Sequence, residues 1–179
     1  MSVDRSTLVW PSEDDIDEGV CQDLNRQYED MQGAKTSDVL VVLNAEAAFT
    51  ASFAEHGDLD EALDVWEDAL EGQCSDWFLL TPVQSLEPGV ASLVAALACL
   101  GCLPFTSCNG GVFGGSHSFA VPHVCFFAQG EHLDALEPLA ERAGVSLSED
   151  SREIGAVVAS SEKIEAMRAF ALSIAQAGD

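Results

Sequence analysis

The segment from Pro88 to Gly101, PGVASLVAALACLG, constrains the fold most strongly because it is apolar on almost every side. Proline is favoured in the first turn of a helix and glycine just after the end, so the segment predicts a helix. Its large apolar side chains cover most of the helix surface: Val90, Leu93, Val94, Leu97 and Leu100. A helix with so little polar surface must be buried, so the rest of the chain has to surround it.

Two β-prone runs follow this helix, CLPFTSC at residues 102–108 and FAVPHVCFF at residues 119–127. A glycine-rich stretch separates them, which predicts an antiparallel hairpin with a long loop. Strand alternation would place Cys108, His123 and Cys125 on one face of the sheet.

A helix is predicted over residues 131–144, with a break or kink at Pro138, because proline removes an amide donor and crowds the preceding turn. The runs VSLSE and GAVVAS predict two short strands, and Ser161 is a candidate cap for a last helix. The order from Glu87 onward is therefore α-β-β-α-β-β-α. This order predicts an α+β protein with a largely antiparallel sheet and helices packed on one face.

The chain before residue 88 divides into two parts. Residues 1–37 are polar and acidic and predict an N-terminal arm with a short helix around Val20 to Met31, while residues 38–179 predict a single α+β domain. Within the domain, DVLVVLNA at residues 38–45 predicts a buried strand, followed by a short helix that ends at Gly57. DWFLLTP at residues 76–82 predicts a second strand.

An amphipathic helix is predicted between these two strands, capped by Asp58 and ending at Gly72. Its apolar stripe consists of Leu59, Leu63, Trp66 and Leu70. Its other face carries Asp60, Asp64, Glu67, Asp68 and Glu71. Like charges four residues apart cost about 0.2–0.5 kcal/mol per pair, so a basic partner on this face would relieve repulsion.

The charge balance excludes several classes of partner. The formal net charge is −24, and no Lys or Arg occurs between Lys35 and Arg142. Such a surface repels nucleic acids and anionic membranes and attracts cationic proteins. The amino terminus lacks the pattern of a signal peptide and the apolar run from Val90 to Leu103 is too short to span a bilayer, so we expect a cytoplasmic protein.

The stretch FTSCNGGVFGGSH is the candidate site, because two glycine pairs permit an unusual backbone path between Cys108 and His117. Either His117 or His123 is a candidate base or co-ligand for a nucleophilic or metal-binding Cys108. The amides around Ser107, Asn109, Gly110 and Gly111 are candidates for binding an anion.

Three interpretations of this stretch remain open. Zinc suits thiolates and imidazoles, but Cys99 and Cys102 form only one C-x-x-C pair in an apolar helix and are better interpreted as buried apolar residues. Covalent catalysis requires a Cys108–histidine contact that the sequence does not establish. A structural turn needs only two to five residues, fewer than this loop contains. The sequence therefore specifies neither a metal nor another cofactor.

The segment from Leu97 to Ala128, with LGCLPFTSCNGG and PHVCFFA, resembles small uncharacterised bacterial proteins that carry a Ser-Cys-x-Gly-[His/Gly] loop. The resemblance implies a loop of that kind at Ser107, Cys108 and Gly110, and it implies no activity. The same element resembles the Ser-Cys-Ser-Gly-Arg loop of wybutosine-synthesising methyltransferases. Gly111 replaces a basic residue of that pattern, and the acidic chain does not suit tRNA, so this function is excluded.

From the sequence we expect an acidic binding protein that engages a basic protein partner, as an immunity protein, antitoxin or inhibitor does. The acidic arm SEDDIDEG would add to the acidic helix face. The alternative is a small-ligand or metal-binding protein, or an enzyme, that uses Cys108, His117 and His123.

Overall fold

In the computed structural model, the apolar segment forms helix α6, Ala91–Cys99, whose residues from Ala91 to Ala98 are all buried. Helices α3, Thr36–His56, and α8, Ile164–Ala177, pack against it, and so do two strands of the sheet. The structure describes residues 3–12, 31, 33–73, 83–114, 117, 119–150 and 155–178. The predicted buried helix is thus the centre of the described core.

The sheet has four antiparallel strands in the order β1-β2-β4-β3. Strand β1 spans Leu103–Cys108, β2 spans His123–Phe127, β3 spans Ser146–Glu149 and β4 spans Ala156–Ser160. The hairpin of β1 and β2 and both later strands confirm the sequence predictions.

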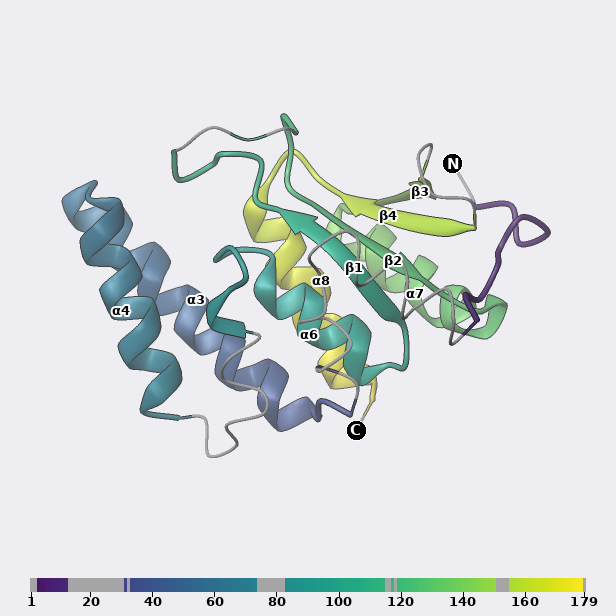
Figure 1. Cartoon of the computed structure of the whole chain (residues 1–179), viewed down its shortest axis with the longest axis horizontal. Coiled ribbons are helices and arrows are strands. Elements are labelled where there is room, and N and C mark those ends of the chain that lie inside the picture. Colours follow the sequence, from purple (N-terminus) through teal and green to yellow (C-terminus); the bar gives the residue numbers. More distant parts are fainter. Residues whose placement is uncertain are drawn as a thin grey trace.

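Helices cover one face of this sheet (Figure 1). Helix α6 contacts β1 and β2, α8 packs between α6 and α7, and α7, Gly130–Ala143, contacts β3. The side chains on the covered face join the hydrophobic core: Val124, Phe126, Leu147, Val157 and Ala159. The predicted α+β class with helices on one face of an antiparallel sheet is confirmed.

The predicted strand at residues 38–45 is wrong, because this run is the first part of α3. The carboxylate of Asp38 accepts the backbone N–H of Lys35 at 2.8 Å, which closes the first turn, and Gly57 ends the helix at φ 69°. The successive buried positions are three, three, one and three residues apart: Val39, Val42, Ala45, Glu46 and Phe49. This spacing belongs to one face of a helix, whereas exposed Leu40 and other apolar neighbours conceal it in the sequence.

Helix α3 is the one helix among the described residues that is long and apolar enough to cross a membrane. In the structure α4, α6 and α8 pack against it, and its central Glu46 is buried in these contacts. The cytoplasmic location stays a prediction.

Helix α4, Leu59–Glu71, confirms the predicted amphipathic helix. The carboxylate of Asp58 accepts the backbone N–H groups of Asp60 and Glu61, at 3.0 and 3.2 Å. The helix packs against α3 at one end of the molecule, away from the sheet (Figure 1). The acidic residues predicted on its other face are all exposed.

Two further details differ from the predictions. Helix α7 continues through Pro138 without a break. Ser161 does not cap α8, because its hydroxyl donates to the carbonyl of Gly144 and accepts the N–H of Lys163, the residue that precedes the helix. The predicted strand at residues 76–82, the predicted helix from residue 20 to 30 and residues 13–19 of the acidic arm lie outside the described residues.

Candidate functional site

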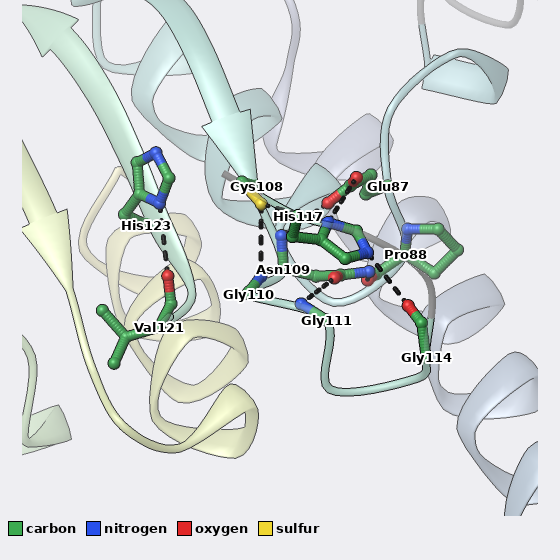
Figure 2. Close-up of polar contacts among 10 residues, drawn as sticks. All are labelled: Glu87, Pro88, Cys108, Asn109, Gly110, Gly111, Gly114, His117, Val121 and His123. Atoms are coloured by element: carbon green, nitrogen blue, oxygen red, sulfur yellow. Dashed lines mark hydrogen bonds and ion pairs between the residues drawn. The ribbon is translucent and has the colours of Figure 1, made fainter. Parts of the chain in front are cut away.

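Three side chains from separate segments meet at one end of β1 (Figure 2). Glu87 precedes α6, Cys108 ends β1, and His117 lies on the far side of the glycine-rich loop. Nδ1 of His117 lies 3.3 Å from Sγ of Cys108 and 3.3 Å from Oε1 of Glu87. All three potential ligand atoms lie within 4.8 Å of one another.

Glycine allows the loop to bring His117 back to Cys108. Gly110 and Gly111 have φ angles of 69° and 73°, in the left-handed region that favours glycine. A Cβ on Gly110 would lie 2.5 Å from the carbonyl carbon of Val121, so the returning chain crosses this residue at close range. A Cβ on Gly111 would lie 3.0 Å from Cδ2 of His117.

Three loop amides donate hydrogen bonds to the cluster or to Asn109 beside it. The N–H of Asn109 donates to Oε2 of Glu87 at 2.6 Å, and the N–H of Gly110 donates to Sγ of Cys108 at 3.3 Å. The N–H of Gly111 donates to the side-chain oxygen of Asn109 at 2.9 Å. These three amides already have acceptors within the protein, so they do not form the anion cradle that the sequence led us to expect.

The hydrogen bond to Gly114 determines which nitrogen of His117 carries the proton. Nε2 lies 2.9 Å from the carbonyl oxygen of Gly114, which can only accept, so Nε2 is the donor. In the neutral imidazole, Nδ1 then has a lone pair directed at the Cys108–Glu87 side of the ring.

The pKa of the Cys108 thiol is raised, chiefly by burial and also by the adjacent Glu87 carboxylate. The backbone N–H groups of Gly110 and Phe119 act in the opposite direction. A reactive cysteine requires a lowered pKa and positive surroundings. Cys108 without a cation is therefore a protonated thiol and a poor nucleophile.

His123 does not join this cluster. The strand register pairs it with Cys108, as the prediction of a shared face requires. However, its Nδ1 lies 3.2 Å from the carbonyl oxygen of Val121, its ring contacts the ring of Phe119, and Figure 2 shows it apart from Cys108. The sequence named both histidines as candidates, and the structure brings only His117 to the thiol.

The other predicted loop residues have different positions. Ser107 pairs with Val124, which belongs to the helix-covered face, so Ser107 lies on the opposite face from Cys108. Asn109 is buried and bridges the loop to the turn before α6, because its side-chain amide lies 3.5 Å from the carbonyl of Pro88. Asn109 therefore connects the glycine-rich loop to the turn that carries Glu87.

Glu87 is a member of the cluster that was not predicted from the sequence. The available signal was an acidic residue directly before the Pro88-Gly89 turn of a buried helix, where a carboxylate is held near a helix start. Nothing in the sequence indicated that this turn lies beside the end of β1.

The predicted acidic face of α4 is exposed, and it consists of Asp60, Asp64, Glu67, Asp68 and Glu71. Within the described part of the chain, none of these residues forms an ion pair with a Lys or Arg. The predicted binding of a basic protein by this face stays a prediction.

The chain matches no protein-family model, no curated protein and no solved structure. A function for this chain therefore has to be inferred from the geometry of the site.

Proposed function

We propose that the protein binds one divalent transition-metal ion, preferentially zinc, through Glu87, Cys108 and His117. Carboxylate oxygen, thiolate sulfur and imidazole nitrogen are the three ligand types of protein zinc sites. The thiolate favours zinc over magnesium or calcium, which prefer oxygen ligands.

The distances between the ligand atoms carry this proposal. Zinc–sulfur and zinc–nitrogen bonds of about 2.3 and 2.0 Å at tetrahedral angles separate the ligand atoms by roughly 3.3–3.6 Å. Two pairs of the cluster, sulfur to Nδ1 and Nδ1 to carboxylate oxygen, are each 3.3 Å apart, and all three ligand atoms lie within 4.8 Å of one another. Small side-chain adjustments would suffice to place the three ligands around one ion.

Each ligand is also held by a backbone group, as is usual around protein metal centres. His117 donates its other ring N–H to Gly114, Cys108 accepts the N–H of Gly110, and Glu87 accepts the N–H of Asn109. These contacts fix the ring tautomer and the orientation of all three side chains before any ion binds.

A bound cation would also resolve the electrostatic conflict in the cluster. The Glu87 carboxylate disfavours the Cys108 thiolate, whereas a divalent ion stabilises both anions together. Covalent catalysis by Cys108 alone is the weaker alternative because it requires the thiolate without this compensation.

Three protein ligands leave one position of a tetrahedral zinc ion for water or substrate, as in catalytic zinc sites. The side chains of Glu87 and His117 are 38% and 16% exposed, so solvent reaches this side of the cluster. We therefore propose a metal-dependent enzyme in which the ion activates a water molecule or polarises a substrate oxygen.

The test is a zinc titration of the metal-free protein in competition with a chromophoric chelator. We expect one zinc ion per chain, and at least a 100-fold loss of affinity for Cys108→Ser, His117→Gln and Glu87→Gln. His132→Gln and Cys125→Ser are matched controls from outside the cluster and should retain wild-type affinity. The Co²⁺ form should show a sulfur-to-metal charge-transfer band that Cys108→Ser lacks. Absence of stoichiometric binding, or equal affinity in all five variants, would refute the proposal.

We also propose, as a second function, that the outer face of α4 binds a cationic protein. The supporting observations are that the five acidic residues of this face are exposed, and that α4 lies at one end of the molecule and packs mainly on α3 (Figure 1). The test is charge reversal: a double variant at Asp64 and Asp68 should bind a lysine-rich peptide more weakly than a double variant of equal net charge on α7.

A further inference from the structure

Glu46 is the one Asp, Glu, Lys or Arg side chain that is buried among the described residues. It lies in the middle of α3 and has no exposed surface. Oε1 accepts the backbone N–H groups of Gly89 and Ser92, at 2.9 and 3.1 Å, and Oε2 accepts the Ser92 hydroxyl at 2.6 Å. Nε of Arg168, on α8, lies 3.6 Å from Oε2.

These contacts replace the cap that α6 lacks. The residue before the helix is Val90, which has no side-chain acceptor, so the first N–H groups of α6 need a partner from elsewhere. Glu46 supplies it from α3, and its carboxylate lies at the positive end of the helix.

The same contacts hold the turn that carries Glu87. Gly89 is two residues from Glu87 and has a φ of 97°, and a Cβ there would lie 2.6 Å from Cγ1 of Ile164. The turn is thus fixed by Glu46 through an amide and by α8 through close packing. On its other side, Asn109 contacts both Pro88 and Glu87.

We propose that Glu46 is a positioning residue for the cluster of Glu87, Cys108 and His117. By fixing the turn before α6, it places the Glu87 carboxylate against the other two side chains. The inference rests on the proposed metal site for its effect on zinc affinity. It also predicts an effect on the metal-free thiol, which does not depend on zinc.

Packing alone does not explain why a carboxylate is buried at this position. Replacing a buried ion pair by apolar residues of similar volume is often neutral or stabilising, so packing alone does not require Glu46. Burial raises the pKa of the Glu46 carboxyl, which shows that the ionised form is costly here. An apolar residue at this position could not accept the N–H groups of Gly89 and Ser92.

The experiment compares Glu46→Ala, Glu46→Gln and Ser92→Ala with wild type, using Leu70→Ala as a control for stability. Leu70 is buried in α4, outside the contacts of Glu46 and of the cluster. Glutamine keeps an oxygen that can accept the N–H groups of Gly89 and Ser92. Glu46→Gln should therefore stay closer to wild type than Glu46→Ala, both in zinc affinity and in the alkylation rate of Cys108. Urea unfolding identifies conditions in which all variants are folded.

We expect Glu46→Ala to weaken zinc binding about 10-fold or more, as loss of supporting contacts does at metal sites, with a smaller loss for Ser92→Ala. In metal-free protein, Glu46→Ala should also speed iodoacetamide alkylation of Cys108, because Glu87 moves away from the thiol. Leu70→Ala should change neither.

The experiment distinguishes failure of the proposed metal site from failure of the positioning role of Glu46. If wild type binds no zinc, the metal site is refuted, and the alkylation rates still test Glu46. If Glu46→Ala matches Leu70→Ala in alkylation rate, and also in zinc affinity where zinc binds, the positioning role is refuted.

Discussion

Sγ of Cys108 and Nδ1 of His117 lie 3.3 Å apart, and Nε2 of the same ring donates a hydrogen bond to the carbonyl oxygen of Gly114. The thiol can therefore donate to Nδ1 in the metal-free protein, because the other nitrogen already carries the ring proton. The same tautomer presents Nδ1 to a metal ion once the thiol loses its proton. The loop thus orients Nδ1 of His117 so that it can either accept a hydrogen bond from the Cys108 thiol or bind a metal ion.

The reactivity of Cys108 should depend on Glu87. Because the Glu87 carboxylate raises the pKa of the Cys108 thiol, Glu87→Gln should lower that pKa and increase the thiolate fraction at pH 8. We expect severalfold faster alkylation by iodoacetamide in the metal-free variant, measured by mass spectrometry of peptides.

Cys102 is the internal control in this measurement. Burial raises the pKa of its thiol to about 12, so it should stay unmodified at pH 8 in both folded proteins. Equal alkylation of Cys108 in wild type and Glu87→Gln would contradict the assigned contact.

Gly110 and Gly114 offer a matched pair for testing the loop. Both have positive φ angles, but a Cβ on Gly114 meets nothing within 4 Å, whereas one on Gly110 overlaps the backbone of Val121 and Pro122. Alanine at either position should cost about 1–2 kcal/mol through backbone strain. At Gly110 the overlap should cost a further ~1–3 kcal/mol and displace His117 from Cys108. Urea unfolding measures the two stabilities, and a similar cost at both positions would argue against the close crossing.

The sequence allowed the fold after Glu87 to be predicted because local signals and tertiary structure agree there. Apolar periodicity, glycine ends and β-prone runs each mark one element, and α6 had to be buried. The strand predicted at residues 38–45 was wrong because α3 is apolar on exposed positions such as Leu40 as well as on its buried face. Periodicity cannot distinguish a strand from a helix in so short a run.

The site could be predicted only in part. Cys108 and His117 were identifiable because glycines between them allow the chain to return. Glu87 is 21 residues from Cys108 in sequence, and its approach depends on how α6 packs against β1. The same dependence on packing explains Glu46, which looks in the sequence like one more acidic residue of an acidic chain.

The buried Glu46 should give stability a pH dependence of known sign. Burial raises the pKa of this carboxyl above its usual value of 4.5, so the folded protein holds the proton to higher pH than the unfolded chain. Its contribution to stability is fully present below about pH 4.5 and is lost as pH rises through the folded pKa. Glu46→Gln lacks this titration. The free energy of unfolding of wild type minus that of Glu46→Gln should therefore fall as pH rises above 4.5, measured by urea unfolding with chelator present. A constant or rising difference would show that the pKa is not raised.

The acidic face of α4 predicts both a stability change and a binding change on charge reversal. Asp64 lies four residues from both Asp60 and Asp68, so Asp64→Lys converts two repulsive pairs into attractive ones. We expect a gain of about 1 kcal/mol in the free energy of unfolding at low salt, which should largely disappear in 1 M NaCl, where screening acts within about 3 Å.

If the acidic face of α4 also binds a cationic protein, reversing Asp64 and Asp68 together should weaken binding of a lysine-rich peptide. The control is Glu131→Lys with Glu141→Lys on α7, which makes the same change in net charge elsewhere. Equal loss of peptide binding in the two double variants would mean that net charge alone attracts the peptide, and α4 would then have no special role.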